Sequence, residues 1–173
     1  MKYQIIKEKD IYRGRLFRVR NARLSYGGYT FWRETVIHPG AAAIVPVITG
    51  HKVILVRQFR YATKREIWEI PAGTLDKNEI PLQCARRELA EETGYSAKVF
   101  KKLAMFYPCP GYSSEIIYLY EACNLTKTDG QEQDIDENIK IRLFSRPEII
   151  KLIRRGKIID AKTIIGLMIW LKK

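Results

Sequence analysis

The stretch Gly73-Thr-Leu-Asp-Lys-Asn-Glu79, continued by Arg87-Glu-Leu-Ala-Glu-Glu-Thr-Gly-Tyr95, is the part of the chain around which the rest is organised. It gathers four glutamate side chains in a protein that is otherwise strongly basic, namely Glu79, Glu88, Glu91 and Glu92. Pro81 is typical of a first helical turn, and Gly94 is typical of the position just beyond a last turn. The segment therefore predicts a helix over about 81–93.

The predicted helix carries an apolar stripe and an acidic cluster on adjoining faces. The stripe is formed by Leu82, Ala85 and Leu89. It is expected to pack on the core, because these positions share one face at about 100° per residue. Glu88 and Glu92 lie beside the stripe four residues apart, and Glu91 lies three residues after Glu88, which are spacings at which helical side chains touch.

Three like charges at this spacing repel one another, so a positive partner is expected. Arg87 stands four residues before Glu91 and can orient it. The remaining negative charge suits Mg²⁺ or Mn²⁺, hard cations that prefer oxygen ligands and are usually shared with substrate phosphates. Such ions polarise a phosphoryl oxygen and activate a water. The acidic side chains are therefore expected to hold metal ions, unless the segment is simply an exposed helix with charges at ordinary spacings.

Composition bounds the class of protein. The 173 residues fit one domain, and 46% hydrophobic with 29% charged residues is typical of a globular protein. Three cysteines without metal-type spacing argue against a disulfide framework or a zinc site and favour a reducing cytoplasm. The first residues do not resemble a secretory signal, and the longest apolar run, residues 164–171, is too short to cross a bilayer.

The net charge of +12 comes from 31 basic and 19 acidic residues. A positive field attracts nucleic acids, nucleotides or acidic membranes. The other interpretation is a solvated surface rich in Lys and Arg, and charge alone does not choose between them.

Strands predominate in the predicted secondary structure. Residues 3–37 read as β-structure, with a hairpin at Tyr26-Gly-Gly-Tyr29 because adjacent glycines supply the positive φ of a tight turn. Further strands are expected at 41–48, 52–59, 97–107, 115–123 and 139–144.

Two more helices and a loop complete the prediction. Ser145 and Glu148 have the spacing of a capping box that opens a helix to about Arg155. Asp160 can cap a last helix through residue 170, and residues 126–138 read as an acidic loop. Helices inserted singly among strands predict an α+β fold or a mixed sheet with helices on its faces.

The opening stretch resembles the signature of the Nudix hydrolases, G-x5-E-x7-R-E-U-x-E-E-x-G-U, where U is a bulky apolar residue. Every specified position is matched, by Gly73, Glu79, Arg87, Glu88, Leu89, Glu91, Glu92, Gly94 and Tyr95. The resemblance implies an α/β/α sandwich around a mixed β-sheet. It also implies a Mg²⁺-binding loop–helix–loop that hydrolyses a nucleoside diphosphate linked to another group.

The flanking segments resemble the ADP-ribose pyrophosphatase branch of that family. The matching segments are residues 33–41, 56–60, 68–73, 110–115 and 160–163. This resemblance implies an N-terminal antiparallel β-region over 1–38, which contributes to dimerisation and to substrate contacts in a homodimer. A Nudix hydrolase domain would follow over 39–173.

The resemblance also assigns site residues. Metal ligands would be the backbone carbonyl of Ala72 and the carboxylates of Glu88, Glu91 and Glu92, with Mg²⁺ as the cofactor and Mn²⁺ as a possible substitute. Catalytic roles would fall to Glu137, Glu91 and Arg87. Substrate-binding residues would be Trp32, Arg33, Arg60, Glu69, Gly111 and Glu115.

Several of these residues have a physical interpretation of their own. Arg60, at a strand end, can fork two hydrogen bonds onto a phosphate, or it is a surface arginine. Arg33 and Trp32 can sandwich an adenine, or the neighbouring aromatics simply fill a sheet face. Gly111 would let backbone approach a ligand closely. Glu115 can accept hydrogen bonds from adenine or ribose, or it is an ordinary strand carboxylate.

A general base is expected in the acidic loop. Glu137 is preferred because the following strand fixes its offset, while Glu132, Asp134 and Asp136 stay possible. The loop could also serve only solvation.

The leading hypothesis is Mg²⁺-dependent hydrolysis of ADP-ribose to AMP and ribose 5-phosphate by a cytoplasmic homodimer. The same cleavage of a nucleotide sugar, FAD or a dinucleotide polyphosphate is the alternative within the enzyme class. A non-catalytic ADP-ribose sensor or an RNA-binding module is the alternative outside it. Nucleic acid is disfavoured because Lys and Arg are dispersed, and no membrane partner is expected.

Overall fold

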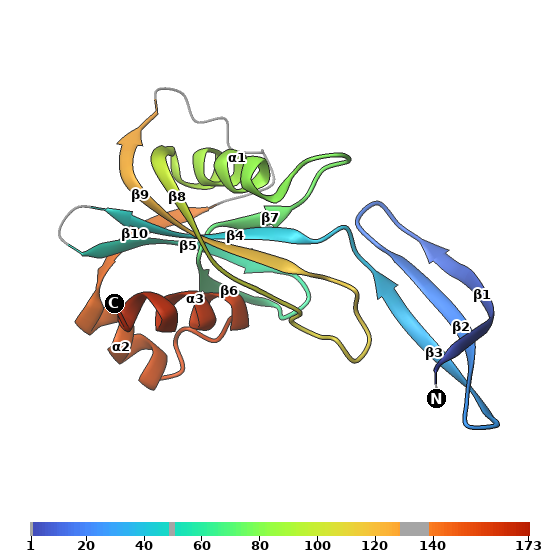
Figure 1. Cartoon of the computed structure of the whole chain (residues 1–173). Helices are drawn as coiled ribbons and strands as arrows, with labels where there is room; N and C mark the ends of the chain where they lie inside the picture. The colour runs from blue at the N-terminus through green and yellow to red at the C-terminus, as the bar shows by residue number, and fades with distance from the viewer. Residues whose placement is uncertain (1, 49–50, 129–138) are drawn as a thin grey trace. The chain divides into compact units, whose positions relative to one another are not determined.

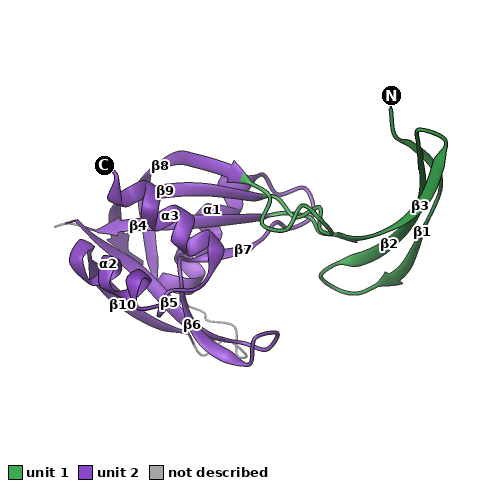
Figure 2. Cartoon of the chain, turned by 90° about the horizontal axis from the view of Figure 1, so that it is seen from below, with its two compact units in different colours: residues 1–40, 106–116 green, residues 41–105, 117–173 purple. Residues whose placement is uncertain are grey.

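The computed structural model describes residues 2–48, 51–128 and 139–173, which form two compact units (Figure 2). The first unit comprises Met1–Gly40 and Phe106–Ile116, and the second comprises Ala41–Met105 and Ile117–Lys173. The domain boundary expected after residue 38 stays a prediction, because the first unit also takes in a segment from the middle of the chain.

The first unit is a three-stranded antiparallel sheet in the order β1-β2-β3. Its strands are β1 (Gln4–Arg13), β2 (Arg18–Tyr26) and β3 (Tyr29–Ile37). The β2–β3 turn has positive φ at both Gly27 (61°) and Gly28 (84°), as the Gly-Gly pair predicted. The segment 106–116 joins β3 through backbone hydrogen bonds from Val36 to Tyr112 (2.7 Å) and from Ser114 to Val36 (2.9 Å).

The second unit is built on a seven-stranded mixed sheet in the order β10-β5-β4-β9-β8, with β6 paired to β5 and β7 paired to β4. Its strands are β4 (Ala41–Ile48), β5 (Lys52–Arg60), β6 (Arg65–Glu69), β7 (Ala72–Thr74), β8 (Tyr95–Phe106), β9 (Ile117–Lys127) and β10 (Lys140–Ser145). The central strand β4 runs parallel to β9 and antiparallel to β5 and β7. The sheet is therefore mixed, as expected.

Helices cover both faces of this sheet (Figure 1). Helix α1 (Pro81–Thr93) lies on one face, while α2 (Arg146–Arg154) and α3 (Ala161–Leu171) lie on the other. Successive residues of β4 point to opposite faces, so Ala42 and Ile44 pack under α1. Val45 lies against Gly166 of α3. This double cover explains why β4 is an almost continuous apolar run, and it confirms the α/β/α sandwich.

The predicted elements agree closely with the observed ones. The end of α1 at Thr93, the Ser145–Glu148 capping box and the Asp160 cap are all confirmed; Ser145 N donates to Glu148 Oε2 (2.9 Å) and Thr163 N donates to Asp160 Oδ2 (2.9 Å). Strands β6 and β7 were not predicted as strands. Both strands are short, and Pro71 lies between them. They form because β6 pairs with β5 and β7 pairs with β4, and these pairings are not visible in the local sequence pattern.

Candidate active site

The rotation of helix α1 about its axis is fixed by contacts at both ends and by its buried face, so the directions of its carboxylates are fixed as well. The N–H of Ile80 donates to Gln83 Oε1 (3.3 Å) at the start, and Gly94 ends the helix with φ of 71°. Ala85 and Leu89 are fully buried in the core. The predicted apolar stripe is thus confirmed, and the residues beside it cannot rotate away from the edge of β7.

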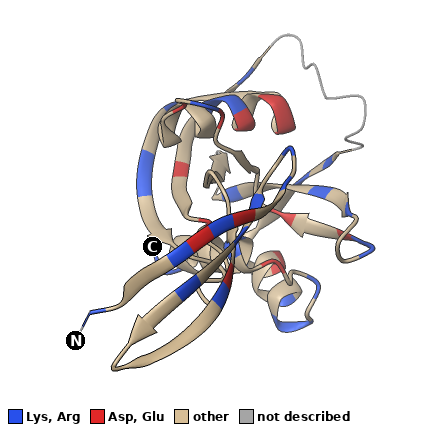
Figure 3. Ribbon diagram, turned by 90° about the vertical axis from the view of Figure 1, so that its right-hand side faces the viewer, with Lys and Arg blue, Asp and Glu red and all other residues tan. Residues whose placement is uncertain are grey.

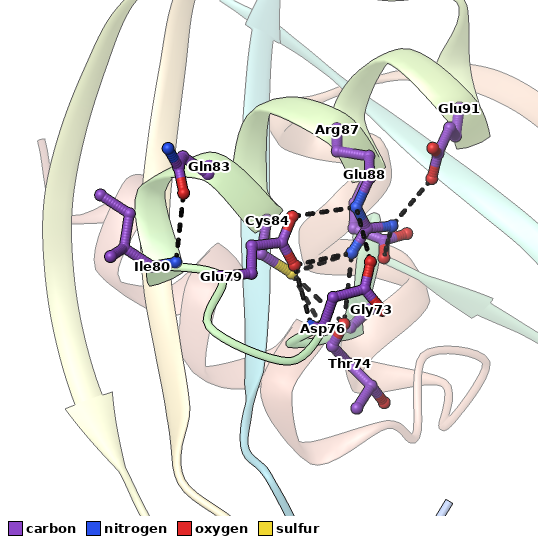
Figure 4. Close-up of polar contacts among 10 residues, drawn as sticks. All are labelled: Gly73, Thr74, Asp76, Glu79, Ile80, Gln83, Cys84, Arg87, Glu88 and Glu91. Carbon is purple, nitrogen blue, oxygen red and sulfur yellow. Dashed lines mark hydrogen bonds and ion pairs between the residues drawn. The ribbon is translucent and has the colours of Figure 1, made fainter. Parts of the chain in front are cut away.

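Arg87 is the hub of the acidic cluster (Figure 4). Its Nε and Nη2 atoms fork onto the two carboxylate oxygens of Glu79, both at 3.0 Å. Its Nη1 donates to Glu88 Oε1 (2.6 Å) and to Glu91 Oε2 (2.9 Å), so the expectation that Arg87 orients Glu91 is confirmed. One guanidinium therefore offsets the repulsion among three carboxylates.

Glu79 has a different role from the helix carboxylates. Besides binding Arg87, its Oε2 accepts a hydrogen bond from the N–H of Asp76 (3.0 Å), which closes the loop before α1. The hydrogen bond from Arg87 lowers the pKa of Glu79 against the opposing effect of burial. Both Glu79 oxygens thus hold Arg87 and the loop, and the broader expectation that this carboxylate also holds metal stays a prediction.

Glu88 lies directly against the backbone of Gly73. A Cβ atom added at Gly73 would stand 1.8 Å from Glu88 Oε1 and 2.0 Å from its Cδ. Gly73 is not in the left-handed region, so only the approach of the carboxylate demands a glycine at this position. The structure thus gives a physical reason for the first position of the motif.

Two buried residues of α1, Glu92 and Cys84, contact the backbone of β7. The N–H of Ala72 donates to Glu92 Oε2 (3.0 Å), and Glu92 is 4% exposed. The buried thiol of Cys84 lies 3.5 Å from Gly73 O and 3.6 Å from Thr74 O. Burial and the charge of Glu88 raise the pKa of the Cys84 thiol to about 12, so this thiol is protonated and can donate a hydrogen bond. The sequence did not predict this role for Cys84.

The donor set at this edge fits a hard divalent cation. It consists of the Glu88, Glu91 and Glu92 carboxylates and the backbone carbonyl of Ala72, which all offer oxygen atoms. The N–H of Ala72 already brings this residue against Glu92. Within the described residues, no three acidic, His or Cys side chains are already gathered as a metal site. The ligand assignment of these four residues therefore stays a prediction.

The side chains of Arg60, at the end of β5, and Glu69, at the end of β6, contact each other, although Glu69 is paired with Val56 in the strand register. Arg60 does form a fork, but in this structure the fork is directed at Glu69, with Nε–Oε1 at 2.7 Å and Nη2–Oε2 at 2.9 Å. Glu69 is 1% exposed and also contacts Lys162. Burial would lower the pKa of Arg60, but the hydrogen bond to Glu69 and the charges of Glu69 and Glu92 raise it. The charge of Glu92 on α1 thus contributes to the raised pKa of Arg60.

The other predicted substrate residues belong to the first unit. Trp32 is 54% exposed, and the Arg33 guanidinium lies 4.5 Å from the centre of the Phe31 ring. A Cβ on Gly111 would meet nothing within 4 Å. Glu115 Oε1 lies 3.9 Å from His38 Nδ1. Their substrate roles stay predictions.

The predicted base, Glu137, lies outside the described residues, as do Glu132, Asp134 and Asp136. No helix in the described parts of the chain is long and apolar enough to span a membrane.

Comparison with known proteins places this geometry in a family. The model of the NUDIX domain matches residues 38–165. The chain is 42% identical to the ADP-ribose pyrophosphatase of Bacillus subtilis (strain 168) over 132 residues, which cover 76% of this chain and 71% of that one. It is 37% identical to the methanol dehydrogenase activator of Bacillus methanolicus over 163 residues, covering 93% and 88%.

A solved structure, described as "Crystal structure of ADP compounds hydrolase", superposes with a TM-score of 0.87 at 24% identity, covering 99% of this chain and 95% of that one. That likeness supports the fold. The family match extends over most of the chain and includes the complete α1 motif, and on this ground the chain belongs to the Nudix family.

Proposed function

We propose that this Nudix protein is a Mg²⁺-dependent pyrophosphatase that hydrolyses ADP-ribose to AMP and ribose 5-phosphate. The observation that carries the proposal is the complete carboxylate–arginine cluster, in which Arg87 of α1 holds Glu88 and Glu91 of the same helix and Glu79 of the preceding loop. The similarity to a Bacillus ADP-ribose pyrophosphatase supports the choice of substrate.

Each side chain has a role in the proposed reaction. Glu88, Glu91, Glu92 and the carbonyl of Ala72 would hold Mg²⁺, with Mn²⁺ as a possible substitute. The bound metal would neutralise charge on the diphosphate and lower the pKa of a water. Arg87 keeps the carboxylates in place. A water oxygen bonds to one phosphorus, the bridging oxygen leaves with the other, and a carboxylate of the acidic loop, Glu137 by preference, takes the proton.

The substrate-binding set completes the proposal. Arg60 would bind the diphosphate, with Glu69 beside it. Trp32 and Arg33 would hold the adenine, and Gly111 and Glu115 would contact the nucleoside. These assignments come from the resemblance of the flanking segments, and the exposure of Trp32 on β3 is compatible with them.

We also propose that the protein is a homodimer. No residue of β1, β2 or β3 is buried within the described chain, and apolar side chains such as Tyr3, Ile5 and Tyr12 are more than half exposed. A second copy would cover such a surface. Light scattering after size exclusion tests this assembly, and a monomer at micromolar concentration would contradict it.

The decisive experiment is Mg²⁺-dependent hydrolysis across ADP-ribose, nucleotide sugars, FAD and dinucleotide polyphosphates, with identification of the products. ADP-ribose should have the highest kcat/KM and yield AMP and ribose 5-phosphate. Higher efficiency on another member of the panel would overturn the choice of substrate but keep the chemistry.

A variant pair tests the metal assignment. Glu92→Gln should remove most turnover and leave the fold intact. Its matched control is Glu121→Gln on β9, which removes a carboxylate that is also buried but is paired with Lys173 instead (2.6 Å). Full activity in Glu92→Gln would refute the assignment.

Two non-enzymatic functions are less well supported. A sensor has no need of a complete catalytic motif, and here all nine motif positions are present. Among the described residues, Lys and Arg occur on several strands and helices rather than on one element (Figure 3), which gives no support to nucleic-acid binding. Steeply salt-dependent RNA affinity without hydrolysis would support RNA binding instead.

A further inference from the structure

A second group of charges lies between β5, β6 and α3, and the proposed mechanism does not use all of it. Glu69, at the end of β6, is 1% exposed and is bound by two cations, Arg60 and Lys162. Lys162 in turn lies 3.1 Å from Asp160 Oδ2. Two carboxylates and two cations therefore form one charge-balanced network.

The network is anchored to the start of α3. Asp160 caps this helix, accepting hydrogen bonds from Thr163 N (2.9 Å) and Thr163 Oγ1 (2.6 Å). The same Thr163 hydroxyl oxygen accepts a hydrogen bond from the N–H of Ile70 (2.9 Å), the residue directly after Glu69. The end of β6 and the first turn of α3 are thus locked together, which fixes the position of Lys162 relative to Glu69.

Lys162 is more deeply buried than Arg60, the other cation that binds Glu69. Its side chain is only 14% exposed, whereas that of Arg60 is 39% exposed. The charge of Glu92 contributes to the raised pKa of Arg60, so Arg60 lies within electrostatic range of the acidic helix. A substrate diphosphate would therefore meet Arg60, while Lys162 stays behind it.

Sharing Glu69 between two cations changes what Arg60 can offer. A buried carboxylate paired with Arg60 alone would neutralise most of the guanidinium charge. When Lys162 takes part of that carboxylate charge, Arg60 keeps more net attraction for an anion. The two-bond fork meanwhile fixes the plane of the guanidinium, so less side-chain freedom is lost when the substrate binds.

We propose that Lys162, acting through Glu69, is a positioning residue that orients Arg60 for the substrate diphosphate and keeps its charge available. The inference rests on the proposed function and deepens it. It also gives Glu69 the role of anchor for Arg60, rather than that of a direct contact with the substrate.

The test measures binding and turnover in Lys162→Met, Lys162→Arg and a matched control. Lys173→Met is the control because it removes a similar lysine from a buried carboxylate, Glu121, outside the site. For Lys162→Met, the Kd of an α,β-methylene analogue of ADP-ribose and the KM should both rise about tenfold, the effect of one charge-assisted hydrogen bond. The kcat should change less than about twofold, and Lys162→Arg should restore most of the affinity.

A double-mutant cycle separates positioning from direct contact. In an Arg60→Ala background, Lys162→Met should cause no further loss of affinity, because the residue through which it acts is gone. Additive losses would overturn the proposal, as would wild-type Kd in Lys162→Met or an equal loss in Lys173→Met. If Lys162→Met does not fold, Lys162→Gln is measured in its place under the same criteria.

The outcomes also separate this inference from the proposed function. If the wild-type enzyme cleaves another nucleoside diphosphate but not ADP-ribose, the substrate assignment fails and the cycle is run with the methylene analogue of the substrate found. If ADP-ribose is cleaved and the Lys162 variants bind as wild type does, only the positioning role fails.

Discussion

The first prediction concerns Gly73→Ala, which adds only one methyl group and is expected to lower kcat. The backbone at residue 73 is not in the left-handed region, so alanine meets no conformational barrier of its own. The obstacle is the Glu88 carboxylate, which would stand 1.8 Å from the new Cβ. Either Glu88 or the β7 backbone has to move.

The size of the effect follows from that distance. Ordinary contact begins at 3.4 Å, so Glu88 Oε1 has to retreat by about 1.6 Å. Such a shift breaks its 2.6 Å ion pair with Arg87 and displaces a proposed metal ligand. Misplacement of about 1 Å at a reacting centre can cost about 100-fold in rate, or about 2.7 kcal/mol in the activation barrier.

The assay is Mg²⁺-dependent release of AMP from ADP-ribose, with thermal unfolding measured in parallel. Gly73→Ala should lose about 100-fold in kcat while it remains folded. Gly156→Ala is the control: its added Cβ meets nothing within 4 Å, and its φ of 62° costs only about 1 kcal/mol of stability. If Gly73→Ala retained full kcat, the close packing of Glu88 on Gly73 would not matter to the site, and this reasoning would be refuted.

Three further predictions follow from named contacts. Arg87→Lys replaces the fork onto Glu79 with a point charge, so kcat should fall about 10- to 100-fold; unchanged kcat would show that Arg87 does not organise the cluster. Gly166→Ala brings a Cβ within 2.9 Å of Val45 Cγ2, so thermal unfolding should reveal a loss of about 1–3 kcal/mol with kcat unchanged; an equally stable variant would contradict the tight packing of α3. Burial would raise the pKa of Glu69, but Arg60 and Lys162 lower it below its ordinary value of 4.5. Its stabilising contribution is therefore complete above pH 4.5 and is lost as pH falls through the lower folded pKa, so urea unfolding of wild type and Glu69→Gln should converge in that acidic range.

The helix 81–93, its apolar stripe and the cap at Asp160 were predicted because they depend on neighbours within a few positions. Strands β6 and β7 escaped prediction because their hydrogen-bonding partners are β5 and β4. The contacts of Arg60 escaped for the same reason, since its fork partner Glu69 is on another strand and Lys162 is on the last helix.

The sequence by itself determined the motif, the reaction class that the motif implies, and the presence of three carboxylates on one side of a helix. These properties follow from spacing along one element, where helical geometry leaves little choice. Only the tertiary structure decided that Glu79 serves Arg87, that Gly73 makes room for Glu88, and that Glu69 links Arg60 to Lys162. Each of these depends on side chains from separate elements meeting in space, and their approach is set by packing across the sheet.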